Sequence, residues 1–400
     1  MKVIHTSDWH LGHRLYNYDR SDEEAHFFGQ LADLIGRERP DALLVSGDVF
    51  HTVAPGNDVA KAFTDRLLAM TAQCPDMETV VIAGNHDSYS RLMVDAALWK
   101  RCHVHVFGLP AEDADGKADF AGNVLELSGK GVIAAVPFCH GRNFPTVDGA
   151  TEAGRQQAYF AGLRKSVEAM NAANLPTVLM AHLAVGKETD FTGQDRGGVI
   201  GGEESVELET LGGGYDYVAL GHIHCPQWIR GARKFARYCG TPRAVHFDET
   251  YGHGADVVTV EAGKDPVVRT AVFAPLRRLE TIGGKTGLPF EDALKALAED
   301  VALPRETYVR LNVALEGGEK IGPDWSERAR QASAARGYRF CLVNPIRHEE
   351  KKVVTAGRPA LTTEELRSLS NDKVIEILSA RHPLTERQRE LVKGLLEAPK

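Results

Sequence analysis

The first hundred residues alternate between strand-like and helix-like runs, and this alternation limits the possible folds more than any other feature of the chain. Apolar runs typical of strands cover 2–6, 42–46 and 79–83, and amphipathic runs typical of helices cover 22–39 and 57–71. Strands that alternate with helices predict a βαβαβ unit with a buried parallel sheet. The sequence therefore predicts an α/β fold.

The remaining chain predicts two further parts. More strands are expected at 124–127, 132–136, 177–181 and 217–220, with a helix at about 153–172. After Gly221, short strand-like runs follow one another without helices, which indicates an antiparallel part of the same sandwich: 226–229, 235–239, 244–247 and 257–260. From Pro275 a new set begins, with strands at 276–282, 308–315 and 339–343 and helices at 290–300 and 325–335.

These patterns predict three domains. We expect a main domain over 1–274, a small α+β capping domain over 275–345, and a linker with a helical tail over 346–400. In the tail, amphipathic runs at 362–368, 372–380 and 386–397 predict short helices.

Side chains that can bind metals follow five predicted strands of the main domain. They are Asp8 and His10, then Asp48, then Asn85, His86 and Asp87, then His182, and finally His222 and His224. Open α/β sheets build their sites at the carboxyl ends of strands. Any one of these residues alone can be a capping or turn residue, but together they favour a single site.

The residue types suit two divalent cations. Phosphodiester hydrolysis needs neutralised phosphate charge, a deprotonated water and a stabilised leaving oxygen, and two cations about 3.5–4 Å apart supply all three. Asp48 is the candidate shared carboxylate. Asp8 and His10 stand two apart on an extended segment and can chelate one ion together, whereas His222 and His224 can serve different ions. Oxygen and nitrogen ligands without thiolate suit manganese, iron or zinc better than calcium.

The overall charge excludes a histone-like binder, because 47 basic and 55 acidic residues give a net charge of −8. Two bound cations would still make the site locally positive towards phosphate. The six cysteines have no CxxC spacing, which argues against a disulfide framework or zinc knuckle and favours a reducing cytosol. The chain has no apolar run of 18 residues, so we expect neither export nor a membrane span.

The pattern D-x-H, GD, GNH[DE], H and GHxH resembles the calcineurin-like metallophosphoesterase superfamily. Within it, MKVIHTSDWHLGH, the DVFH after Gly47, DYVALGHIH and RYCGTP are similar to the SbcD family, the nuclease subunits of bacterial SbcCD complexes. The likeness is strong over about 1–275, while the smaller domain and tail match in size and order. It implies a four-layer β-sandwich flanked by helices, followed by the capping domain and helical tail.

The resemblance also implies two ligand sets that share one carboxylate: Asp8, His10, Asp48 and His224 for the first ion, and Asp48, Asn85, His182 and His222 for the second. The ions are most often manganese. His86 is implied as the catalytic histidine that binds no metal, and Asp87 is expected to orient its imidazole by a hydrogen bond. His51 lies in a stretch that approaches DNA, although a structural role at a helix start fits equally well.

The function implied by the resemblance is metal-dependent DNA cleavage, as a double-strand exonuclease and as an endonuclease on single strands and hairpins. It implies work with the SbcC ATPase in DNA repair, recombination and replication, in the bacterial cytoplasm near the nucleoid. A homodimer within the complex and docking of the tail on SbcC are also implied.

Basic residues between Cys225 and Phe247 are candidate DNA contacts, because this stretch holds no acidic residue. The candidates are Arg230, Arg233, Lys234 and Arg237, with Arg243 in the same stretch. A solvated hairpin with scattered arginines explains them equally well.

Two other functions stay open. One is the same chemistry on another phosphoester, such as a phosphoprotein or a cyclic nucleotide. The other is a non-catalytic scaffold, which would be expected to lose ligands, whereas this chain keeps all of them.

Overall fold

The structure is a computed structural model, and it describes residues 1–186, 189, 205–229, 235–300, 302–316 and 319–347. The chain divides into two units, 1–347 and 348–400. The predicted tail helices therefore lie outside the described residues, as do Arg230, Arg233 and Lys234. No helix within the described ranges is long and apolar enough to cross a membrane.

The first sheet contains the predicted parallel unit. Its strand order is β12-β11-β1-β2-β3-β4, in which β1 to β4 are parallel and the other two pair antiparallel. The strands are β1 (Lys2–Thr6), β2 (Ala42–Ser46), β3 (Glu78–Ile82), β4 (Val104–Phe107), β11 (Gly254–Thr259) and β12 (Val267–Val272). Four helices follow the first three strands: α1 (Ser21–Glu38), α2 (Asn57–Gln73), α3 (Tyr89–Met93) and α4 (Ala96–Trp99).

The second sheet has the order β5-β6-β7-β8-β10-β9, with parallel central strands and an antiparallel strand at each edge. Its strands are β5 (Val124–Leu127), β6 (Gly131–Val136), β7 (Thr177–His182), β8 (Tyr217–Gly221), β9 (Gln227–Trp228) and β10 (Ala236–Tyr238). The helix α5 (Arg155–Met170) joins β6 to β7, as predicted.

One predicted strand, 244–247, is wrong. Side chains rather than a neighbouring strand take up its backbone groups, because Arg20 Nη1 donates to the Ala244 oxygen (2.7 Å) and Glu249 accepts from the Val245 nitrogen (2.9 Å). The segment therefore folds as an irregular loop.

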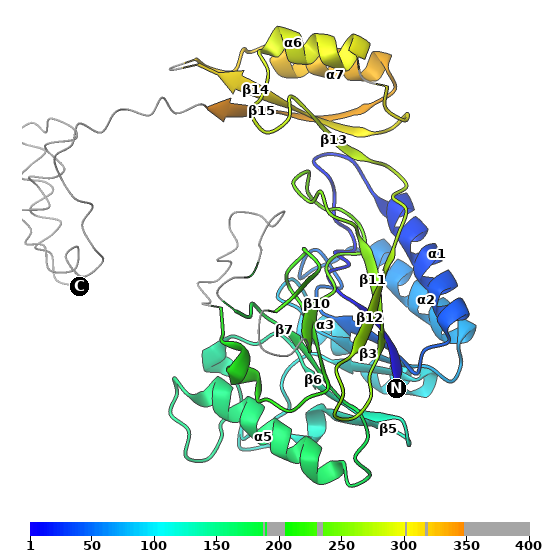
Figure 1. Ribbon diagram of the computed structural model, residues 1–400, viewed down its shortest axis with the longest axis vertical. Helices are drawn as coiled ribbons and strands as arrows, with labels where there is room; N and C mark the ends of the chain where they lie inside the picture. Colours follow the sequence, from blue (N-terminus) through cyan, green and yellow to red (C-terminus); the bar gives the residue numbers. More distant parts are fainter. Residues whose placement is uncertain (187–188, 190–204, 230–234, 301, 317–318, 348–400) are drawn as a thin grey trace, which may run out of the picture. The chain divides into compact units, whose positions relative to one another are not determined.

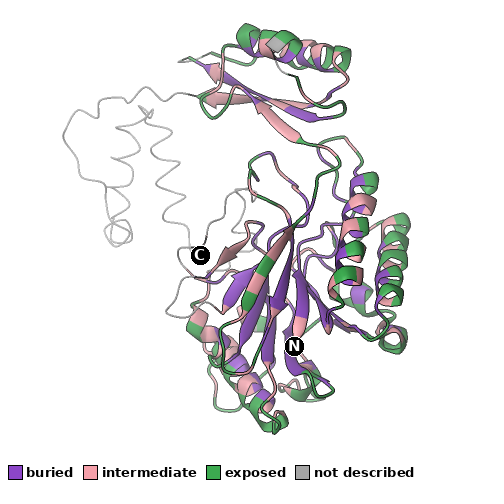
Figure 2. Ribbon diagram, turned by 45° about the vertical axis from the view of Figure 1, so that its right-hand side comes forward, coloured by how far each residue is buried: buried purple, intermediate pink, exposed green. Residues whose placement is uncertain are grey.

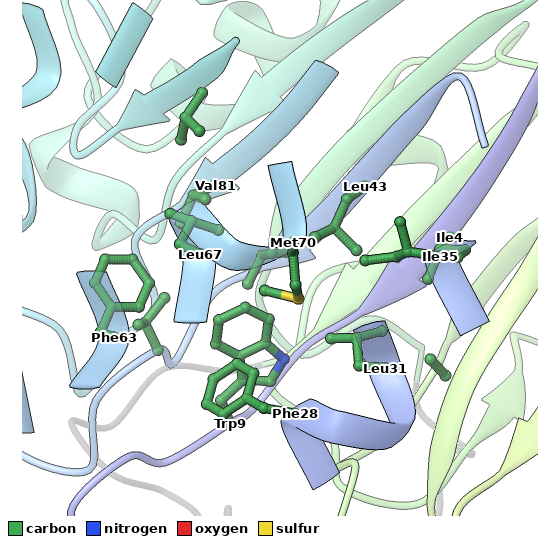
Figure 3. Packing of buried hydrophobic residues seen from close by; sticks show 14 of the residues in the cluster. Ile4, Trp9, Phe28, Leu31, Ile35, Leu43, Phe63, Leu67, Met70 and Val81 are labelled. Carbon is green, nitrogen blue, oxygen red and sulfur yellow. The ribbon is translucent and has the colours of Figure 1, made fainter. Parts of the chain in front are cut away.

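Strand alternation builds four layers, with the two sheets between outer helices (Figure 1). In β2, Leu43 and Val45 face the core with α1 and α2, while Ala42 and Leu44 face the layer between the sheets. Figure 2 shows the central strands buried and the helices exposed on their outer faces. Figure 3 shows the hydrophobic core between the first sheet and helices α1 and α2. There Trp9 packs edge-on against Phe28, with ring centroids 5.0 Å apart. The expected four-layer α/β sandwich is confirmed.

A third, parallel sheet has the order β13-β14-β15. It consists of β13 (Leu279–Ile282), β14 (Tyr308–Leu315) and β15 (Arg339–Arg347), with α6 (Phe290–Lys295), the π-helical turn η5 (Ala296–Asp300) and α7 (Trp325–Ala335). Phe290 stacks on Trp325 at 4.4 Å, so the helices pack on each other as well as on the sheet. The elements predicted for this region are confirmed.

Candidate metal centre

The polar residues predicted at five strand ends lie together, because the strands of both sheets deliver them to one edge. The strand ends can come this close because two glycines, Gly84 and Gly221, leave room for the neighbouring chain. A Cβ on Gly84 would lie 2.1 Å from Asp48 Oδ1, and one on Gly221 would lie 1.8 Å from the Ser46 oxygen. Larger residues would therefore push the strand ends apart.

One side of the edge gathers Asp8, His10 and His224, whose ligand atoms all lie within 4.8 Å of one another. The Nε2 atoms of His10 and His224 face each other at 3.1 Å. The Asp8 carboxylate accepts from Ser7 Oγ (2.5 Å) and from the His222 backbone nitrogen (3.1 and 3.2 Å). We call these three residues the first half of the centre.

The other side gathers Asn85, His182 and His222. The Asn85 Oδ1 atom lies 3.0 Å from both His182 Nε2 and His222 Nδ1. Asp48 lies between the two sides, with Oδ1 3.4 Å from His182 Nε2 and Oδ2 3.8 Å from His10 Nε2. We call Asn85, His182 and His222 the second half, and Asp48 is placed to serve both.

Two of the imidazoles are held through their Nδ1 atoms. His182 Nδ1 donates to the Ser46 carbonyl oxygen (2.7 Å), and His224 Nδ1 lies 2.8 Å from Glu249 Oε1. Such contacts orient each ring and turn its Nε2 atom towards the centre. Glu249 was not among the residues predicted from the sequence, because it lies 25 residues after His224 in an irregular segment without a motif.

The buried charges depend on one another. Burial raises the pKa of Asp8, and it lowers the pKa of His222 to about 3. Burial also acts to lower the pKa of His182, but the Asp48 carboxylate outweighs this and raises it to about 9. Two buried carboxylates among imidazoles are a setting in which added positive charge is favourable.

The donor set fits divalent cations. His10 and His224 face each other through their Nε2 atoms, and both nitrogens could donate a lone pair to one cation. Carboxylate, amide and imidazole donors suit manganese, iron or zinc. All seven residues predicted as ligands thus lie at this edge, in two overlapping acid–histidine groups and the Asn85 contacts.

His86 lies beside the ligands with one ring nitrogen held. Its Nδ1 donates to the His51 carbonyl oxygen (2.9 Å), and its backbone nitrogen donates to Asp48 Oδ1 (2.9 Å). Its Nε2 lies 4.0 Å from Asp48 Oδ2, and its side chain is 29% exposed. The ring can therefore reach both the centre and a substrate.

The expected hydrogen bond from Asp87 to the His86 ring is wrong. The buried Asp87 carboxylate instead accepts from the backbone nitrogens of Val49 (3.1 Å), Phe50 (2.8 Å) and Gly84 (2.8 Å). Burial raises the pKa of Asp87 to about 7. Asp87 therefore ties the loop after β2 to the loop after β3, and the His51 carbonyl orients His86.

Arg237 is wrong as a DNA contact. Its Nε donates to Asp256 Oδ2 on β11 (2.6 Å), and the side chain is buried between the sheets. Arg243 is also buried, and its Nη2 donates to the His10 oxygen (3.2 Å) and to Glu24 (3.1 Å). Neither guanidinium can meet a DNA backbone.

His51 packs within a histidine cluster. Its ring centroid lies 4.7 Å from that of His13 and 5.8 Å from that of His86. His10, His51 and His86 form a third group of potential ligand atoms. The structure thus brings His51 to the edge of the centre.

Comparisons with known proteins identify a family and several relatives of this chain. The family described as calcineurin-like phosphoesterase matches residues 1–226. A protein of Bacillus subtilis is 32% identical over 88% of this chain and 87% of its own length, and one of Rhodobacter capsulatus is 30% identical over 76% of each. A protein of Escherichia coli is 25% identical over 99% of this chain and 96% of its own length. The names of all three describe the D component of the nuclease SbcCD.

Proposed function

The chain belongs to the SbcD family of calcineurin-like phosphoesterases, and from this we propose that it is a metal-dependent DNA nuclease. The protein would hydrolyse DNA phosphodiesters, as an exonuclease on double strands and as an endonuclease on single strands and hairpins. The observation that carries the proposal is the meeting of all seven candidate ligands at one edge of the two sheets.

The proposed cofactor is a pair of divalent ions, with manganese as the first candidate. Asp8, His10 and His224 would hold one ion, and Asn85, His182 and His222 the other, with Asp48 shared. When bound, two divalent ions neutralise charge on phosphate oxygens and lower the pKa of an attacking water.

The protein's own groups position the reaction. His86 is fixed through Nδ1 on the His51 carbonyl, which leaves Nε2 to stabilise the phosphorus centre or to deliver a proton to the leaving oxygen. Asp87 is a positioning residue, because its carboxylate holds the two loops that carry Asp48 and Asn85. The His51 ring stacks on the His86 ring, with centroids 5.8 Å apart, and this supports a role for His51 beside the substrate.

DNA and other phosphoesters share this metal chemistry, so the substrate needs a direct test. End-labelled linear duplex DNA and a phosphopeptide are incubated with the protein and manganese. We expect short labelled products from DNA and negligible phosphate release from the peptide. The reverse pattern would assign the centre to another phosphoester.

The non-catalytic alternative is tested at His86. We expect His86→Ala to keep both metal ions and to lower the rate of DNA cleavage by about 10²- to 10⁴-fold, the usual contribution of a general acid. Elemental analysis measures the metals, and initial rates measure cleavage. An unchanged rate would refute the catalytic role of His86.

We also propose that the protein works with the SbcC ATPase and that residues 346–400 dock on it. The named relatives are components of SbcCD, which supports such a partnership. A chain that ends near residue 346 should lose SbcC in a pull-down while still hydrolysing a small diester. Retained association would contradict the role of the tail.

A homodimer is the remaining partner proposal. Large apolar side chains are exposed on and beside helices α2 and α4, namely Leu68 on α2 (39%), Val94 between α3 and α4 (74%) and Leu98 on α4 (64%). Phe63 of α2 and Trp99 of α4 pack edge-to-face (6.2 Å), so the two helices are neighbours, and we propose that these exposed side chains contact a second copy. Leu98→Asp should convert a dimer to monomers in light scattering, and a monomeric wild-type chain would refute the proposal.

A further inference from the structure

A hollow of about 1300 Å³ lies beside the metal centre and has no role in the metal chemistry. Its lining includes Gly84, Asn85 and Asp87, which belong to the centre, and continues over α3, β4 and the segment after β6. Pockets for small molecules usually measure about 300–1,000 Å³. This hollow is therefore large enough for an extended ligand that enters from the reaction centre.

An aromatic pair lines the hollow where it adjoins the centre. The Phe138 ring lies 6.3 Å from the His182 ring and 5.1 Å from the His140 ring, in both cases edge-to-face. Phe138 is half-buried and His140 is exposed, so both keep surface for a ligand. Neither residue belongs to the candidate ligand set.

The backbone fixes this pair relative to the ligands. The Phe138 nitrogen donates to the Ala83 oxygen at the end of β3 (2.8 Å), which ties the segment after β6 to the loop that carries Asn85. The Phe138 ring therefore stands at a set distance from any phosphate bound at the centre.

We propose that Phe138 and His140 form a stacking platform for an unpaired base next to the scissile phosphate. This inference rests on the proposed nuclease function and deepens it, because it names single-stranded nucleic acid as the occupant of the hollow. Aromatic side chains accept any base by stacking, so the platform would favour unpaired over paired DNA without selecting a sequence.

Parts of the remaining lining suit the same occupant, although the Glu112 carboxylate also lines the hollow. Met93 and Phe107 supply apolar wall, and the exposed Lys100 offers positive charge to a following phosphate. Because Asn85 and Phe138 both line the hollow, a strand whose phosphate lies at the centre can place a neighbouring base over Phe138.

The test compares three single strands in which every linkage but one is a methylphosphonate, so that cleavage occurs at one place. The first strand carries all its bases, and each of the other two lacks the base on one side of the scissile phosphate. With manganese, we expect the wild-type kcat/KM for the complete strand to be about tenfold higher than for one of the two strands that lack a base. This factor is in line with the energy of stacking one base on one aromatic ring.

Variants of Phe138 assign the preference to the ring. Phe138→Leu should reduce the tenfold preference to about one, whereas Phe138→Tyr should retain it. Phe120→Leu is the matched control, because Phe120 packs on Tyr159 of α5 (5.6 Å) and does not line the hollow, and it should keep the wild-type preference. A preference that survives in Phe138→Leu would overturn the inference.

A second measurement does not depend on the variants. A strand with 2-aminopurine next to the scissile phosphate should lose fluorescence on binding to the wild-type protein, and the same probe five nucleotides away should not. Equal emission from both probes, or a wild-type kcat/KM preference near one on both sides, would overturn the platform. A wild-type protein that hydrolyses bis(p-nitrophenyl) phosphate but cuts no DNA would overturn the proposed nuclease function itself.

Discussion

The two halves of the metal centre use similar ligands but differ in what lies behind them. In the first half, His224 is backed by the Glu249 carboxylate, which is itself buried and accepts from the Val245 nitrogen. In the second half, His182 is backed by a neutral peptide carbonyl, and His222 meets the Asn85 amide oxygen. A carboxylate makes its imidazole a more basic ligand than a carbonyl does.

This difference indicates unequal ion affinity. The first half has the backing charge of Glu249, whereas no carboxylate backs an imidazole of the second half, although Asp8 and Asp48 both lie within 4.8 Å of His182. We therefore expect the first half to bind its ion more tightly. An ion in the second half would exchange more readily as substrates and products come and go.

The largest effect is expected from Asp48→Ala, which removes the shared carboxylate and so disables both halves together. Elemental analysis should find neither ion at full occupancy, and cleavage should fall by more than about 10³-fold. Asp33→Ala, an exposed acid on α1, is the control and should behave as wild type. One ion bound at full affinity would show that Asp48 is not shared.

A smaller and selective effect is expected from Glu249→Gln, which keeps the side-chain shape but removes the backing charge. Ion affinity in the first half should fall by about 10- to 100-fold, the usual cost of losing such a partner. Calorimetric titration with manganese should show one weakened site and one unchanged site. Glu261→Gln, at an exposed acid, serves as control, and equal weakening of both sites would remove the distinction between the halves.

The smallest effect is expected from Ser7→Ala, which removes the hydroxyl that donates to Asp8 Oδ2. The same titration should show about fivefold weaker binding in the first half, since a net hydrogen bond contributes about 1 kcal/mol. The His222 backbone nitrogen still donates to Asp8, which limits the loss. A change in the second half instead would indicate that Ser7 acts on the loop and not on Asp8.

Most strands, and the meeting of the candidate ligands at one sheet edge, could be predicted from the sequence because both depend on local patterns. Buried strands read as continuous apolar runs, and residues such as Asp8 and His10 follow them directly. Glu249 was not predictable in this way. Its carboxylate meets His224 only through the path of the irregular segment that precedes β11.

The prediction that Arg237 contacts DNA was wrong for a related reason. On β10 its neighbours Ala236 and Tyr238 face the core with α5, so Arg237 faces the layer between the sheets. There the partner Asp256 comes from β11 of the other sheet. A count of basic residues cannot detect a buried ion pair whose partner arrives from a different layer.

The candidate ligands come from both sheets, and this has a consequence for folding. Asp8 contacts the backbone of His222, more than 200 positions away, so the centre forms only after both sheets have docked. Contacts of such long sequence separation form slowly. Ions that bind this edge stabilise the folded state by an amount that grows with the logarithm of the free ion concentration above the dissociation constant, and so they hold the two sheets together as one cooperative unit. Metal binding during refolding would therefore show when the two sheets of the main domain have docked.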